Sequence, residues 1–210
     1  MLNKEHWMYT ISKLITELIR IQDSLVPIED ERGEHVRGSY KFIPNHAPDV
    51  VQCFLKATYI LCRETLWTRS KNSLRFLDVG CGFGNIMLLA KATSLANEIH
   101  GLEHNVSNVR AAKRLLGVKR GKESIYKVIK GNALKFNGYG NYDIIYFYQP
   151  FQDYELAKQF ERRLIHQMQV GAAVIPFLPN YIGEKPDERL KNVGPRIFLK
   201  VQEEEQCTPN

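Results

Sequence analysis

Three glycines alternate with other residues directly after an acidic side chain, in the segment Asp78-Val79-Gly80-Cys81-Gly82-Phe83-Gly84. An apolar run, residues 74–79, ends at this segment, and a second apolar run begins after Asn85. This order predicts a buried strand that turns into a helix near Asn85. Because glycine has no Cβ, the backbone can take positive φ there and a ligand can lie directly against it. The helix N-terminus adds unpaired N–H groups and a positive dipole end, so this turn (residues 80–84, the glycine turn) is predicted to bind a nucleotide-like ligand.

The spacing of the glycines separates two kinds of nucleotide site. The dinucleotide fingerprint G-x-G-x-x-G would need glycine where the chain has Asn85 or Met87. The pattern acid-x-Gly-x-Gly-x-Gly resembles motif I of the class I S-adenosylmethionine (SAM)-dependent methyltransferases. SAM carries an ammonium and a sulfonium, so an acid at the strand end suits it, whereas a pyrophosphate needs only N–H donors. The resemblance implies an α/β fold with a Rossmann-like, mostly parallel sheet and helices on both faces. It also implies SAM contacts at Asp78, Gly80, Cys81, Gly82 and Gly84.

A second acid follows at the end of the next predicted strand, residues 98–103. Glu103 lies about 20 residues after the glycine turn, where a carboxylate can accept both ribose hydroxyls of a bound nucleoside. His104 follows it and could flank the adenine. Because we expect Glu103 to be an exposed strand-end acid, Glu103→Ala is predicted to lower SAM affinity and leave the fold intact.

Two further cofactor contacts are implied by the resemblance alone. After a predicted strand at 124–129, Gly131-Asn132-Ala133 resembles the family's Gly-Asp-Ala segment, whose acid contacts the adenine amine. Asn132 replaces that acid, and its carbonyl can accept the same hydrogen bond without charge; Ala133 completes the segment. The resemblance also implies a lid over SAM before the first core helix, with Tyr40, Phe42 and Pro44 as its candidates. Anchoring that helix on the sheet is the alternative role of these residues.

The segment Gln149-Pro150-Phe151 follows the predicted strand 143–148. It resembles the Asn/Asp-Pro-Pro-Tyr/Phe motif of amino-directed methyltransferases, although Gln replaces Asn and only one proline is present. The resemblance implies that Gln149 and a backbone carbonyl accept hydrogen bonds from the target amine, and that Phe151 packs on the substrate. Tyr148 or Tyr146, which alternation puts on one side of the strand, could face the methyl donor. A strand end without a catalytic role is the alternative.

The remaining elements must bring these residues together. Apolar or alternating segments predict strands at 171–175, ended by Pro176, and at 196–201, an antiparallel edge strand, with a loop at 178–195 between them. Helical spacing predicts helices at 11–19, 49–66, 107–116 and 153–168. In an open α/β sheet, ligands collect at the carboxyl ends of the strands, so Asp78, Glu103, Asn132 and Gln149 are expected to share one crevice. The predicted domains are an N-terminal helical extension and lid (1–70), a methyltransferase domain (71–205) and a tail (206–210).

Bulk composition limits the class of protein. With 210 residues, 44% hydrophobic and 25% charged, the chain suits a soluble globular domain. It shows no membrane-spanning run and no signal peptide, and its four cysteines lack metal-binding spacing, so we expect a cytoplasmic protein without a metal. The net charge of +6 includes eight bases against one acid in residues 110–130. This stretch is either a phosphate-binding face or a solvated helix and loop.

Together these features predict a SAM-dependent methyltransferase whose acceptor is a nitrogen on a protein or a small molecule. Two alternatives stay open. The basic stretch permits an RNA or DNA methyltransferase, and the departures at Gln149-Pro150-Phe151 permit a non-catalytic SAM-binding or scaffold subunit. The sequence does not identify the acceptor or the oligomeric state.

Overall fold

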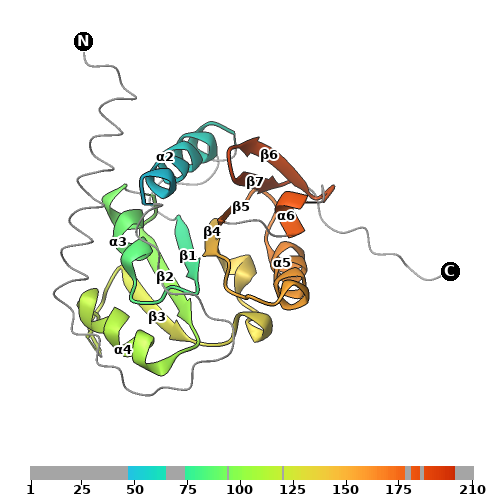
Figure 1. Ribbon diagram of the computed structural model, residues 1–210. Helices are drawn as coiled ribbons and strands as arrows, with labels where there is room; N and C mark the ends of the chain where they lie inside the picture. Colours follow the sequence, from blue (N-terminus) through green and yellow to red (C-terminus); the bar gives the residue numbers. More distant parts are fainter. Residues whose placement is uncertain are drawn as a thin grey trace, which may run out of the picture.

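A sheet with the strand order β3-β2-β1-β4-β5-β7-β6 forms the centre of the protein (Figure 1). The computed structural model describes residues 47–64, 74–93, 95–119, 121–177, 181–184 and 187–201. Strands β1 to β5 are parallel, and β7 runs antiparallel to both β5 and β6. The strands are β1 (Arg75–Val79), β2 (Glu98–Glu103), β3 (Tyr126–Lys130), β4 (Ile144–Tyr148), β5 (Ala173–Phe177), β6 (Leu190–Gly194) and β7 (Ile197–Lys200). The predicted Rossmann-like, mostly parallel sheet is confirmed.

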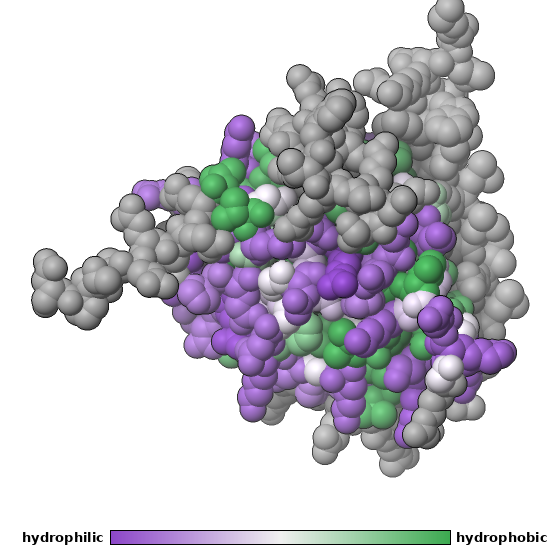
Figure 2. All heavy atoms as spheres, turned by 180° about the vertical axis from the view of Figure 1, so that it is seen from behind, coloured by the Kyte–Doolittle hydropathy of each residue, from purple (hydrophilic) through white to green (hydrophobic). Residues whose placement is uncertain are grey.

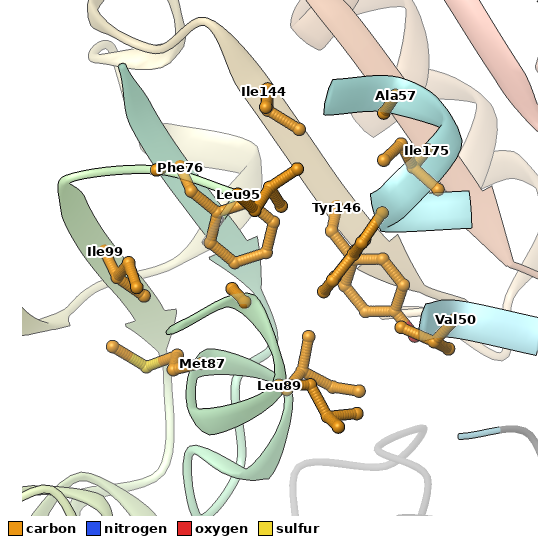
Figure 3. Packing of buried hydrophobic residues seen from close by; sticks show 14 of the residues in the cluster. Val50, Ala57, Phe76, Met87, Leu89, Leu95, Ile99, Ile144, Tyr146 and Ile175 are labelled. Carbon is orange, nitrogen blue, oxygen red and sulfur yellow. The ribbon is translucent and has the colours of Figure 1, made fainter. Parts of the chain in front are cut away.

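Helices cover both faces of this sheet, as predicted (Figure 1). One buried cluster lies between the sheet and α2, α3 and α4, and includes Phe76, Tyr146 and Leu89 (Figure 3). A second cluster lies on the other face and contains Phe147 with Phe160 of α5. The helices are α2 (Ala47–Glu64), α3 (Asn85–Ala92), α4 (Val106–Leu115), α5 (Tyr154–Gln167) and α6 (Tyr181–Glu184), with 3-10 turns η3 (Ala133–Lys135) and η4 (Tyr139–Asn141). Seen from behind, the described surface is mostly hydrophilic, with separate smaller hydrophobic areas (Figure 2).

Local capping explains where α4 begins and ends and where α5 begins. The Asn105 side-chain oxygen accepts hydrogen bonds from the backbone N–H groups of Ser107 (2.8 Å) and Asn108 (3.4 Å) and so starts α4 directly after β2. Gly117, with φ +64°, follows the end of α4 as predicted. Asp153 Oδ1 accepts from the N–H of Leu156 at 2.9 Å and starts α5. Both predicted helices are confirmed to within one or two residues.

The C-terminal part of the sheet differs from the prediction in two ways. The segment 178–195, predicted as a loop, contains α6 and β6. Strand β7 is therefore not the edge strand, because β6 pairs with its outer side. The sequence of β6 has no alternating apolar pattern, and its extended form depends on pairing with β7. Strand β5 also continues through Pro176 to Phe177, so the predicted end at Pro176 is wrong. The β5–β7 pairing covers only Ala173 and Val174, so no strand on that side needs the N–H that proline lacks.

The N-terminal prediction is tested only where α2 is described. Val50 and Phe54 of α2 are buried in the first core cluster, so this helix shares its core with the sheet although we had assigned it to the 1–70 extension. The predicted helix at 11–19, the lid candidate Tyr40 and the tail 206–210 lie outside the described residues. None of the helices in the described ranges combines the length and hydropathy needed to cross a membrane.

Candidate functional site

The glycine turn packs against the end of β2. The N–H groups of Gly80 and Cys81 both donate to the carbonyl oxygen of Leu102, at 2.8 and 3.2 Å, and the Gly84 N–H donates to the Cys81 oxygen at 2.8 Å. Gly80, Gly82 and Gly84 have φ values of +78°, +53° and +90°. An L side chain rarely adopts these values, so the alternating glycines satisfy a real backbone requirement.

The three glycines differ in what surrounds them. A Cβ on Gly82 would meet nothing within 4 Å, so the backbone there is open to a ligand. A Cβ on Gly84 would lie 3.0 Å from Cδ1 of Leu116, so Gly84 permits close packing on the end of α4. A Cβ on Gly80 would lie 3.7 Å from the Cβ of Pro150, which brings the glycine turn next to the end of β4. Gly82 is therefore the one of the three glycines whose missing side chain leaves open space for a cofactor.

Glu103 points toward the glycine turn. Its Oε2 accepts a hydrogen bond from the Gly82 N–H at 2.9 Å, and its Oε1 accepts one from the Asn105 N–H at 2.7 Å. The side chain is buried, with 9% of the residue exposed, and not the exposed strand-end acid that the sequence suggested. Each carboxylate oxygen can accept a second hydrogen bond, so the two ribose hydroxyls of a nucleoside could still bind here.

Asp78 is a buried acid with an unused oxygen. It is 2% exposed, and no described residue donates a hydrogen bond to its Oδ2. Burial raises the pKa of this carboxyl well above its usual value, and the nearby negative charge of Glu103 is a second, smaller cause. A buried acceptor without a partner is costly unless something fills the position. The ammonium of the predicted cofactor is a suitable partner, so the residues at this edge fit SAM.

Cys81 and Gly101 shape the space beneath the glycine turn. Burial raises the pKa of the Cys81 thiol well above its usual value, so this side chain is a neutral packing group. A Cβ on Gly101, in the middle of β2, would lie 2.6 Å from both Cys81 Sγ and Met87 Sδ. Gly101 is not among the residues that the sequence predicted for the site. The signal that could have identified it is its place inside a predicted strand, because a glycine there often marks a point where another segment or a ligand packs directly against the backbone.

The segment after β3 lies beside Glu103. The Gly131 N–H donates to the Glu103 backbone oxygen at 2.9 Å, which sets Asn132 and Ala133 at the same edge. Asn132 Oδ1 accepts from the Leu134 N–H at 2.8 Å, so one of its two lone pairs is engaged in starting η3. The Tyr139 hydroxyl donates to the Ala133 oxygen at 2.8 Å. His104 is exposed at the start of the loop to α4.

The end of β4 has an unusual backbone. Gln149 has φ +30°, a strained value for a residue with a side chain, and its N–H donates to the Phe177 oxygen at 3.2 Å. The Tyr148 ring, half-buried, stacks on the Phe177 ring with centroids 6.5 Å apart and an interplanar angle of 20°. Phe151 is half-buried and packs on Phe160 of α5 at a centroid distance of 5.6 Å.

Tyr146 and Tyr148 pack on the same face of the sheet, as alternation predicted. Tyr146 is fully enclosed between Phe54 and Phe177, and burial raises the pKa of its hydroxyl well above the usual value. Tyr148 is the one of the two that reaches the end of the strand.

Of the predicted residues, those on β1, β2, β4 and after β3 therefore meet at the carboxyl edge of the parallel strands (the rim). Within the described ranges, no three His, Cys, Asp or Glu side chains are grouped so as to hold a metal.

Comparison with known proteins agrees with this arrangement. The model of a family described as methyltransferase small domain matches residues 56–173. A protein from Pyrococcus horikoshii assigned as an RNA methyltransferase is 19% identical, with a TM-score of 0.56 over 82% of this chain and 77% of that chain. A protein from Haemophilus influenzae assigned as a methylase is 17% identical, with a TM-score of 0.54 over 73% of this chain and 98% of that chain. The YcgJ protein of Bacillus subtilis is 16% identical, with a TM-score of 0.45 over 61% of this chain and 49% of that chain, so the match spans about half of that protein. No curated protein sequence matches the chain significantly.

Proposed function

Because the chain belongs to the methyltransferase small domain family and is therefore a SAM-dependent methyltransferase, we propose that it methylates a nitrogen on a protein or small molecule. SAM supplies an electrophilic methyl group on its sulfonium. The protein must hold this donor, orient the acceptor nitrogen in line with the methyl carbon and sulfur, and exclude competing water. We assign the first task, holding SAM, to the glycine turn and Glu103. We assign the second, orienting the acceptor, to the end of β4.

One observation carries the proposed cofactor site: both oxygens of Glu103 are held by backbone N–H groups, one of them that of Gly82. These hydrogen bonds fix the carboxylate against the open side of the glycine turn, where its remaining lone pairs would accept the ribose hydroxyls. Asp78 would accept from the ammonium through its unpartnered Oδ2. Asn132 would contact the adenine, and Tyr40 stays the proposed lid residue.

The proposed acceptor site is the end of β4. Pro150 lies beside Gly80, so Gln149, the residue before it, is close to the glycine turn. An amide oxygen there can accept a hydrogen bond from an amine N–H and turn the nitrogen lone pair toward the methyl group. The strained backbone of Gln149 supports this role, because strain that the fold maintains is concentrated at functional positions. Tyr148 would line the same space, and Pro150 and Phe151 would support it.

A nucleic acid is the second candidate acceptor, favoured by one observation. The bases on α4 and β3 are exposed, among them Arg110, Lys113, Arg114, Lys127 and Lys130. An exposed group of this kind can neutralise backbone phosphates. We favour the first candidate because the glycine turn and the β4 end give it specific geometry. We also propose a cytoplasmic location, supported by the free thiols of Cys53 and Cys81.

The proposal is tested by two measurements on the full chain. Calorimetric titration with SAM is expected to give one saturable site. Transfer of labelled methyl from SAM into a cell extract is then measured separately in protein, nucleic acid and small-molecule fractions, before and after protease or nuclease. Label in the protein or small-molecule fraction supports the proposed acceptor, and label that only nuclease releases supports the second candidate. Failure to bind SAM would refute the cofactor site.

A further inference from the structure

The turn between β6 and β7 places a cation, Arg196, beside the carboxyl end of β5. This is the side of the rim next to β4, where the acceptor is proposed to bind. Because Phe198 of β7 is paired with Val174 of β5 in an antiparallel arrangement, Arg196 lies beside the last residues of β5. Arg196 is exposed, and the centre of its guanidinium lies 4.5 Å from the centroid of the Phe177 ring. Phe177 is itself fully buried, and its ring also stacks with that of Tyr148. A cation–π contact of this kind fixes the guanidinium plane and leaves its N–H edge to other partners.

Two strained residues contact Phe177, one through its backbone and one through its ring. Among the described residues, Gln149 (φ +30°) and Arg196 (φ +58°) are the only non-glycine residues with positive φ. Gln149 donates its N–H to the Phe177 oxygen, and Arg196 covers the Phe177 ring. Backbone strain persists where the surrounding structure holds it, and it is concentrated at binding and catalytic positions. Phe177 therefore holds both the backbone of Gln149, the residue proposed to orient the methyl acceptor, and the guanidinium of Arg196.

The charge of Arg196 is not neutralised by the described part of the protein. Arg75 and Arg189 form ion pairs with Glu98 and Asp187, at 3.1 and 2.8 Å, but no described acid or hydrogen-bond acceptor pairs with Arg196. A second cation lies close by, since a Cβ on Gly194, the last residue of β6 before this turn, would be 3.0 Å from Nζ of Lys56. A guanidinium that lies over an aromatic ring and pairs with no described acceptor is suited to bidentate binding of an oxyanion.

The position of this cation favours a small ligand over a polyanion. The exposed bases of α4 and β3 lie at one end of the strand order, whereas β7 lies near the other end, with β2, β1, β4 and β5 between them. In the described residues that directly follow β1, β2 and β4 there is no lysine or arginine, so this part of the chain forms no basic stripe between the two groups. Nucleic-acid binding needs several phosphate contacts along a track, whereas a pair of cations suits a single anionic group.

We propose that Arg196 binds one oxyanion group, a carboxylate or a phosphate, on a small-molecule methyl acceptor, and so sets the acceptor nitrogen against Gln149. This specificity role rests on the proposed function, because it requires that the β4 end receives the acceptor. Arg196 touches the acceptor away from the reacting atoms. Its loss should therefore raise the acceptor KM and leave SAM binding unchanged.

Direct binding is tested first, with inorganic phosphate, acetate and a ten-residue oligouridylate as probes. The readout is the NMR signal of the Arg196 side-chain Nε–H in protein saturated with S-adenosylhomocysteine, at ionic strength held constant with KCl. The signal is assigned by its absence in Arg196→Gln. A saturable shift with phosphate or acetate supports the proposal, and the stronger of the two identifies the anionic group. No shift beyond that of KCl overturns it. A shift with oligouridylate alone also overturns it, in favour of a nucleic acid acceptor.

Turnover is tested next, by labelled-methyl transfer to the small-molecule ultrafiltrate of a cell extract in a dilution series. Arg196→Gln is expected to raise the apparent KM by about 10- to 100-fold, the size of a lost charge-assisted hydrogen bond. Arg196→Gly removes the same charge and relieves the positive φ, so an equal effect in this variant excludes misfolding as its cause. Lys191→Gln, on exposed β6, is the matched control and should behave as wild type.

The outcomes separate the two proposals. If wild type does not bind SAM, the proposed function fails. If wild type binds SAM and transfers label but both Arg196 variants have unchanged KM, only the role of Arg196 fails. A fall in kcat with unchanged KM would also overturn that role, since an anion-binding residue acts on acceptor affinity.

Discussion

Glu103→Gln keeps the shape of the side chain and changes the chemistry of one of its two oxygens. The wild-type oxygens accept backbone hydrogen bonds from Gly82 and Asn105, at 2.9 and 2.7 Å, and would accept the two ribose hydroxyls with their other lone pairs. A glutamine amide has one oxygen and one NH2, so the NH2 must face one of these backbone N–H donors and cannot accept from a ribose hydroxyl.

The size of the effect follows from these contacts. A hydrogen bond to a charged group contributes about 1.5–3 kcal/mol, so losing one ribose contact should weaken S-adenosylhomocysteine binding about 10- to 100-fold. Leaving one backbone donor of Gly82 or Asn105 unsatisfied costs about 1–3 kcal/mol of folding free energy. For a domain of this size that lowers the melting temperature by roughly 2–4 °C per kcal/mol. Glu103→Ala removes both acceptors and should destabilise more, contrary to the sequence-based expectation of an intact fold.

The assay is calorimetric titration with S-adenosylhomocysteine, together with thermal unfolding without ligand. Glu98→Gln is the control, since Glu98 lies at the other end of β2 and forms a half-exposed ion pair with Arg75, whose loss should cost at most about 1 kcal/mol. Equal affinities for wild type and Glu103→Gln would refute the role given to the carboxylate. An unchanged melting temperature for Glu103→Ala would refute its structural part.

Three further predictions follow from the rim. Burial raises the pKa of the Asp78 carboxyl well above its usual value, so the folded protein holds a proton that the unfolded chain has lost above pH about 4, and stability falls as the pH rises. Asp78→Asn removes this dependence, and its melting temperature minus that of wild type should be larger at pH 8 than at pH 5. Gly84→Ala combines positive φ with a Cβ 3.0 Å from Leu116, so denaturant titration should show a free energy of unfolding lower by about 2 kcal/mol. The decrease should be smaller for Gly82→Ala, where the Cβ is unobstructed. Gln149→Ala should leave SAM affinity unchanged by calorimetry and lower kcat by about 10-fold in labelled-methyl transfer.

Each of these has a contradicting outcome. A pH-independent difference between Asp78→Asn and wild type would mean that the buried carboxyl does not carry the raised pKa. Equal stability of the two glycine variants would mean that α4 moves away from the turn at no cost. Unchanged turnover in Gln149→Ala would remove this amide from the mechanism.

The sequence predicted the first half of the sheet and its turn because their signals are local. Alternating glycines after an acid and a buried strand identify the turn by themselves, and Glu103 follows from the strand that comes next. The convergence of Asp78, Glu103 and the segment after β3 follows from the general rule for parallel sheets. The family match and the strand order confirm the fold that these residues implied.

What the sequence did not predict depends on contacts between distant segments. β6 has no apolar pattern and is extended because it pairs with β7. Pro176 ends a strand by local rules, yet β5 continues because β7 has already ended its pairing there. The conformation of Gln149 and the place of Arg196 over Phe177 result from the meeting of β4, β5 and the β6–β7 turn. No local pattern in the chain encodes that meeting.

The central claim is that the cofactor lies at the rim, between the glycine turn and the end of β2. Mapping backbone amide NMR shifts during titration with S-adenosylhomocysteine tests it most directly. We predict saturable shifts at Gly82, Glu103 and Asn132, with little change at Arg75 and Glu98 at the opposite edge of the sheet. Shifts concentrated at Arg75 and Glu98, or no saturable shifts at all, would contradict the account.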